Sequence, residues 1–221
     1  MLAKGGAFVW LLVGEFWLSG LFVLSVIFLK IVDLDTLTLW TFLAYSLGSF
    51  SAGILSDIIG RRWLFVVSSC VLFTSSVILL MDLYVGFILA NLCIGPLNNL
   101  TFVFINENYQ NKAEINTVKV LVGWALSEIT LGVFFLIVEN TNIFYYCLIA
   151  CSLSYAVGAI ILTQETQEFI EKKEKLRKRS VKEILLPKEF SAIIGGSILM
   201  FMMQMFYYRT QFTLDRFGIS L

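Results

Sequence analysis

Seven stretches of predominantly apolar residues, each about 20 residues long, dominate the sequence. They run over about 7–29, 37–58, 63–83, 84–105, 117–138, 143–163 and 191–210. A helix needs roughly 20 apolar residues to cross the hydrocarbon core of a bilayer. Because backbone polar groups in lipid must find partners inside the protein, spanning segments of this length are helices rather than barrel strands. The sequence therefore predicts an all-α membrane protein.

Lysine and arginine are distributed unevenly between the two sides that this pattern defines. With the N-terminus in the cytoplasm, only Lys30 falls outside, and Arg209 and Arg216, at or beyond the last stretch, are not assigned. The residues that fall inside are Lys4, Arg61, Arg62, Lys112, Lys119, Lys172, Lys173, Lys175, Arg177, Lys178, Arg179, Lys182 and Lys188. Cytoplasmic loops carry an excess of such residues. We therefore expect an integral, multi-pass membrane protein whose N-terminus is cytoplasmic or on the equivalent matrix side.

A polar stretch rich in Glu, Lys and Arg separates the sixth apolar stretch from the seventh. Glu171 and Lys175 are spaced four residues apart with the acid first, which supports a solvated helix. Ser180 and Glu183 have the spacing of a capping box, which predicts a short amphipathic helix ending near Pro187. The stretch could contact anionic lipid or simply be a solvated connector. The expected domains are a six-helix bundle over 1–163, a charged cytoplasmic linker over 164–190, and a seventh helix with the C-terminal end over 191–221.

Composition argues against several other classes of function. The formal net charge is zero, which gives no general attraction to nucleic acid. The chain has no His, the commonest metal ligand and proton-transfer group near neutral pH. No phosphate-binding glycine loop or clustered set of metal ligands is present in the sequence. We therefore expect neither an enzyme nor a bound cofactor or metal.

Residues 53–62 join the second and third apolar stretches and read G-I-L-S-D-I-I-G-R-R. Gly53 would let another helix approach closely, Asp57 could cap or pair at a helix end, and Gly60 would permit a tight reversal. Arg61 and Arg62 would hold the turn on the cytoplasmic side. This segment resembles the signature loop G-x-L-x-D-x-x-G-R-R of the major facilitator superfamily of solute transporters.

Two further segments are similar to the sugar-porter and organic-ion branches of that superfamily. Residues 123–128, G-W-A-L-S-E, resemble the fifth helix of organic-ion carriers, and the charged linker resembles the connector between the two six-helix halves. The resemblance implies a six-helix N-terminal bundle followed by a seventh transmembrane helix. The family has twelve spans, so the chain corresponds to the N-terminal half plus one helix.

The resemblance also implies a cytoplasmic charge network, and the sequence keeps only part of it. Glu107 and Glu165 retain acidic positions of that network. Glu114 and Glu168 stand where the family has Arg. Because like charges repel where opposite charges attract, the network is not expected to form in its usual way.

Four polar residues inside the apolar stretches are candidates for a solute or proton site. Glu15 and Glu128 are carboxylates within spans, where each costs roughly 2.5–3.5 kcal/mol on insertion scales and normally faces a cavity or partner. Asn98 and Asn99 follow Pro96, which can kink a helix and free a backbone carbonyl. These groups could bind a cationic or polar solute or carry a proton. They could equally be buried as neutral acids or hydrogen-bonded to neighbouring helices.

The resemblance leads to two expectations for function. The first is transport of a small organic solute by alternating access, which rocks one bundle against another around a midplane site. A lone half-length chain is not expected to transport, so a second copy, a partner chain or a longer sequence would have to supply the other bundle. The second expectation is a transport-dead accessory subunit of a larger membrane complex. In either case, we expect the lipid bilayer and further membrane subunits as partners, covering the face of the missing half.

Overall fold

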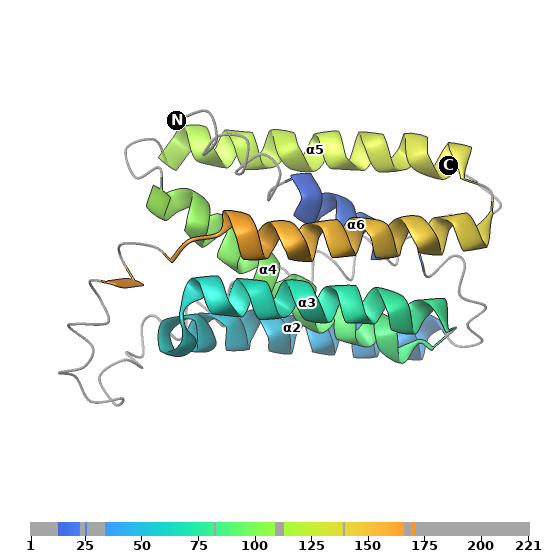
Figure 1. The fold of residues 1–221 in the computed structure, drawn as a ribbon, viewed down its shortest axis with the longest axis horizontal. Helices are drawn as coiled ribbons and strands as arrows, with labels where there is room; N and C mark the ends of the chain where they lie inside the picture. Colours follow the sequence, from blue (N-terminus) through green and yellow to red (C-terminus); the bar gives the residue numbers. More distant parts are fainter. Residues whose placement is uncertain are drawn as a thin grey trace. The chain divides into compact units, whose positions relative to one another are not determined.

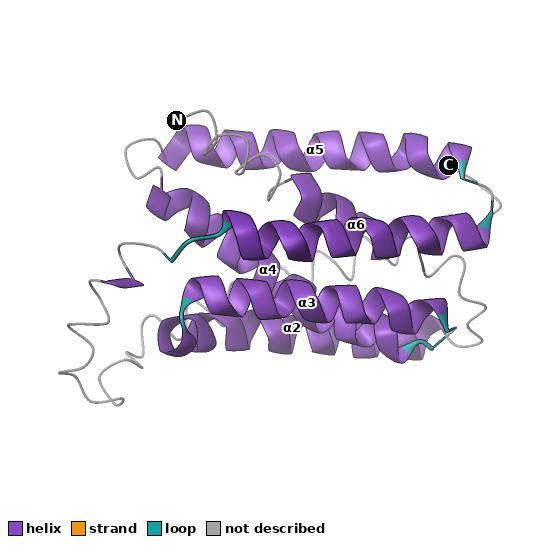
Figure 2. Ribbon diagram, viewed as in Figure 1, coloured by secondary structure: helices purple, strands orange, loops and turns teal. Residues whose placement is uncertain are grey.

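The structure, a computed structural model, describes residues 13–22, 25, 34–81, 83–108, 113–138, 140–165 and 169–170. All of them belong to the first of the two compact units into which the chain divides, Met1–Glu174. The described residues are helical apart from short connections, and none of them forms a strand (Figure 2). The expected all-α fold is therefore confirmed for this part of the chain. The seventh apolar stretch and residues 171–190 of the linker lie outside it.

The described helices coincide with the second to sixth apolar stretches of the sequence. Residues 13–22, within the first stretch, are also helical. The later helices are α2 (Leu34–Ile59), α3 (Arg61–Leu80), α4 (Val85–Asn108), α5 (Ala113–Ile137) and α6 (Thr141–Leu162). Their ends lie within a few residues of the expected positions, because polar residues and the turns at Gly60 and Asn140 interrupt the apolar sequence.

Three of these helices are long and apolar enough to cross a membrane. They span Leu39–Ile59, Arg61–Leu80 and Thr141–Leu162. Two shorter apolar helical stretches, Val85–Thr101 and Val122–Phe134, lie in α4 and α5. Many large apolar side chains of these helices are exposed. A hydrophobic exterior of this kind suits a protein surrounded by lipid.

Helix α4 lies at the centre of the contacts among the described helices. It packs against α2 and α3, and α3 also packs along α6 (Figure 1). Phe65 of α3 joins these elements, because its ring lies 5.5 Å from that of Phe104 on α4 and 6.0 Å from that of Tyr155 on α6. All three rings are buried. Edge-on and tilted arrangements at such distances are favourable for aromatic pairs.

Glycines let α2 and α4 approach each other closely. A Cβ atom at Gly48 would collide with the backbone carbonyl of Leu92. A Cβ at Gly95 would lie 2.6 Å from both the Tyr45 carbonyl oxygen and the Ser49 hydroxyl. Small residues at such positions are typical of helix contacts within membranes, where close backbone packing replaces the hydrophobic effect.

Buried hydroxyl groups line the side of α3 that faces its neighbours. Ser69 and Ser75 donate to the carbonyl oxygens of Phe65 and Val71, one turn earlier in the same helix, at 2.8 Å each. The hydroxyl groups of Ser76 and of Ser152 on α6 form a hydrogen bond with each other at 2.7 Å. These three serines of α3 are therefore buried with their hydroxyl hydrogen bonds made.

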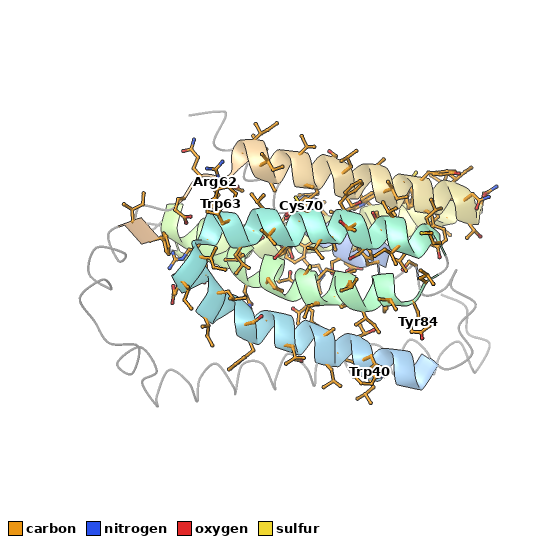
Figure 3. All side chains as sticks on the ribbon, turned by 60° about the horizontal axis from the view of Figure 1, so that its bottom comes forward. Trp40, Arg62, Trp63, Cys70 and Tyr84 are labelled. Carbon is orange, nitrogen blue, oxygen red and sulfur yellow. The ribbon has the colours of Figure 1, made fainter. Side chains whose placement is uncertain are left out.

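Exposed aromatic residues mark the two ends of the bundle. Trp40 on α2 and Tyr84, just before α4, lie towards one end, whereas Arg62 and Trp63 lie at the other end of α3 (Figure 3). The guanidinium of Arg62 lies 5.9 Å from the centre of the Trp63 ring. Tryptophan and tyrosine gather at both membrane–water interfaces. Their separation along the helices suits two such interfaces.

Candidate functional site

The turn between α2 and α3 depends on a single glycine. α2 ends at Ile59 and α3 begins at Arg61, so Gly60 alone makes the reversal. Gly60 has φ 112° and ψ 145°, a backbone conformation that residues with a Cβ rarely adopt. This backbone conformation explains why the signature-like segment has a glycine at position 60.

The carboxylate of Glu165, which follows α6, caps the start of α3. Its Oε1 accepts hydrogen bonds from the backbone N–H groups of Arg61 at 3.1 Å and Arg62 at 3.3 Å. The first N–H groups of a helix have no partner within the helix, and the helix dipole favours negative charge there. We call this arrangement the Glu165 cap. It joins the signature-like segment to the start of the charged linker, and the paired residues are 103 and 104 positions apart in the sequence.

Neighbouring contacts close the Glu165 cap on both sides. A Cβ at Gly60 would lie 2.7 Å from Glu165 Oε2 and 3.4 Å from the ring of Phe169. Arg62 also donates from Nη2 to the carbonyl oxygen of Ile160, near the end of α6, at 3.4 Å. Arg61 is buried. The end of α6 is therefore held against the α2–α3 turn by both charge and shape.

The other members of the signature-like segment and charge network have fewer contacts. Asp57 is exposed in the last turn of α2 and makes no hydrogen bond or ion pair with a described residue. Gly53 is exposed, with nothing near the position of a Cβ, so the close helix neighbour expected there is not among the described residues. Glu107 lies in α4, but its side chain is outside the described part.

Glu15 lies in the interior between the helical segment 13–22, α4 and α6. It is 3% exposed, and neither carboxyl oxygen makes a hydrogen bond of ordinary geometry with a described residue. The Thr101 hydroxyl faces the carboxyl, and Tyr155 lies beside it with its ring 3.0 Å from where a Cβ on Gly14 would be. An ionised carboxylate without donors is costly to bury. These surroundings therefore favour the neutral acid.

Glu128 is in the opposite situation, because it is exposed on α5. The indole Nε1 of Trp124, one turn earlier, donates to Glu128 Oε1 at 3.2 Å. Asn98 and Asn99 instead bond to α2. Asn98 Nδ2 donates to the Tyr45 hydroxyl at 3.2 Å, and Asn99 Nδ2 donates to the carbonyl oxygen of Ser49 at 3.1 Å.

The four candidate polar residues do not share one environment, because Glu15 is buried whereas Glu128 and Asn99 are exposed. No hydrogen bond or ion pair among the described residues links Glu15, Glu128 and the two asparagines. Sequence reasoning missed Thr101 and Tyr155, since a threonine and a tyrosine in apolar helices give no signal until packing sets them beside a carboxyl. Within the described part of the chain, no group of three or more acidic or cysteine side chains is placed to hold a metal ion.

No family model matches the chain, and no curated protein matches it.

Proposed function

We propose that this chain forms the N-terminal bundle of a carrier of the major facilitator type for a small organic solute. The Glu165 cap carries the proposal. Glu165 keeps an acidic position of the cytoplasmic charge network that the resemblance implies, and its carboxylate binds the first N–H groups of α3 beside the signature-like segment. A contact between two segments that each resemble parts of the family supports the family interpretation.

In this proposal the Glu165 cap makes the cytoplasmic end of the bundle rigid. Alternating access requires a bundle that moves as a body around a site near the midplane. The Gly60 turn, with two backbone N–H groups at the start of α3 donating to Glu165 after α6, keeps α3 and α6 together during such a movement. A second bundle is required for the rocking motion, from a second copy, another chain or further sequence.

Glu15 is the residue we propose as the proton carrier. Its burial without a described hydrogen-bond donor favours the neutral acid in the present conformation. A conformation that admitted water to the carboxyl would favour the ion, so the proton would leave when the site opens. An ionisable residue inside a membrane segment is by default a hypothesis for a functional site, because such residues are costly to place there. Asn98 and Asn99 are used within the bundle and are weaker candidates for contacting a solute.

Uptake into proteoliposomes tests the proposal. The chain is purified in mild detergent together with whatever binds it, and native mass spectrometry records the composition. Labelled hexose, tetraethylammonium and p-aminohippurate then serve as neutral, cationic and anionic probes under an imposed pH gradient. We expect one probe to accumulate above the level in protein-free vesicles and to do so less with Glu15→Gln. Accumulation of none of them would count against transport.

A second candidate is a transport-dead accessory subunit of a membrane complex. The engagement of Asn98 and Asn99 by α2 favours it, because polar groups that a solute could use already bond within the bundle. In that case the same mass spectra should show unrelated membrane subunits in fixed stoichiometry, with no uptake of any probe. A self-assembled or two-bundle particle with uptake would exclude it.

A further inference from the structure

Helix α5 carries a carboxylate on an otherwise apolar surface. Glu128 lies at the midpoint of the apolar stretch Val122–Phe134 and is exposed. Large apolar side chains elsewhere on the same stretch are exposed as well, among them Leu126, Ile129 and Val133. If only lipid covered this surface, the carboxylate would face hydrocarbon, where charged groups are strongly disfavoured.

The described residues do not satisfy this carboxylate. Trp124 is the single donor to Glu128 among them, and it reaches only Oε1. The neighbouring side of α5 is already occupied, since Ser127 donates to the Val13 carbonyl oxygen at 3.5 Å and Leu131 packs onto Gly20. Glu128 is therefore exposed beside the contact that holds α5 to the bundle and is not part of it.

Gly132, one turn after Glu128, adds a second feature to the same face. It is exposed, and nothing lies within 4 Å of where its Cβ would be. Trp124, Glu128 and Gly132 are spaced four residues apart, so they share one face of the helix. A glycine in a membrane helix lets the backbone of another helix approach closely. We call these three residues the α5 face.

We propose that the α5 face binds a transmembrane helix of a partner protein that carries a lysine or arginine at the depth of Glu128. Gly132 admits the partner's backbone, and the basic group pairs with the carboxylate. The inference does not depend on the proposed function, because either a second transporter bundle or a subunit of a complex could supply such a helix.

Charge complementarity favours a different protein over a second copy of this chain. Around a parallel two-fold axis, α5 would place one Glu128 against the other. The cation of α5 in the sequence is Lys119, about 13 Å along the helix axis from Glu128. A parallel pair of α5 helices therefore supplies no basic group at the depth of Glu128, whereas a partner helix with a central basic residue does.

A pair of synthetic helices provides the test. One is a leucine-rich transmembrane peptide with a single central lysine, and the other has leucine at that position. Each peptide carries a donor dye, the intact chain carries an acceptor dye on a terminal tag, and energy transfer is measured in phosphatidylcholine vesicles. We expect the lysine peptide to bind the wild-type chain roughly ten-fold more tightly than the leucine peptide, a difference of about 1.4 kcal/mol.

Three variants locate the binding surface. Glu128→Gln should lower binding of the lysine peptide to the level of the leucine peptide, and Gly132→Leu should weaken binding of both peptides by filling the approach. Val133→Leu, on the next residue but on another side of α5, should change neither. Equal binding of the two peptides to the wild-type chain would overturn the proposal without any variant having to fold. Native mass spectra showing a homodimer that Glu128→Gln abolishes would also overturn it, in favour of a second copy.

Discussion

Replacement of Glu165 by alanine is expected to destabilise the bundle by removing the cap of α3. Two backbone N–H groups lose their acceptor, with distances of 3.1 and 3.3 Å in the structure. Loss of a capping side chain typically costs about 0.5–2 kcal/mol, and hydrogen bonds to a charged group contribute about 1.5–3 kcal/mol. Glu165 is half-buried, so water can replace part of what is lost. We expect a fall of about 1–3 kcal/mol in the free energy of unfolding.

Two matched variants separate the cap from other effects of the substitution. Glu165→Gln keeps an acceptor oxygen but removes the charge at the helix N-terminus, so it should cost about 0.3–1 kcal/mol, less than alanine. Gln164→Ala changes the exposed neighbour, whose replacement should stay within about 0.5 kcal/mol of wild type. Unfolding is followed by steric trapping in bicelles. If Glu165→Ala is no more destabilising than Gln164→Ala, the hydrogen bonds to α3 do not stabilise the bundle.

Three further predictions follow from individual contacts. Gly60→Ala should lower the free energy of unfolding by about 1–3 kcal/mol because of the positive φ at this position. The loss should be smaller in a Glu165→Ala background, where the clash with Glu165 Oε2 is gone. Equal losses in both backgrounds would refute the contact. A double-mutant cycle of Ser76→Ala and Ser152→Ala should give a coupling near 0.6 kcal/mol, roughly the average for membrane hydrogen bonds, and zero coupling would place the two hydroxyls apart. Glu15→Gln should leave the free energy of unfolding near the wild-type value but reduce uptake driven by a pH gradient. Unchanged uptake would make Glu15 structural.

The sequence predicted the helices well, because long apolar stretches leave few alternatives in lipid. Gly60 stands where a break was expected, and its positive φ explains why the turn needs no more residues. The three helices that are long and apolar enough to cross a membrane are fewer than the seven spans expected from the whole sequence. Parts of the first, fourth and fifth stretches lie outside the described side chains, and the seventh lies wholly outside the described residues.

The candidate site was less predictable, because it depends on which helix faces meet. Sequence could flag Glu15 and Glu128 as costly in lipid, but it could not tell that one is buried and the other exposed. That difference is set by rotation of each helix about its axis, which apolar residues on all sides leave undefined. Glu165 was singled out only as a remnant of the charge network, and its contact with the start of α3 depends on where the chain places the end of α6.

The serines of α3 have a consequence for how the chain is made. Ser69 and Ser75 donate their hydroxyl hydrogen bonds to carbonyl groups of α3 itself, so these two donors are satisfied before α3 meets another helix in the bilayer. α6 emerges from the ribosome only later, and Ser152 likewise donates to the Ile149 carbonyl oxygen of its own helix, at 3.0 Å. The two helices can therefore insert one after the other, with these hydroxyls hydrogen-bonded within each helix, and associate later through Ser76 and Ser152.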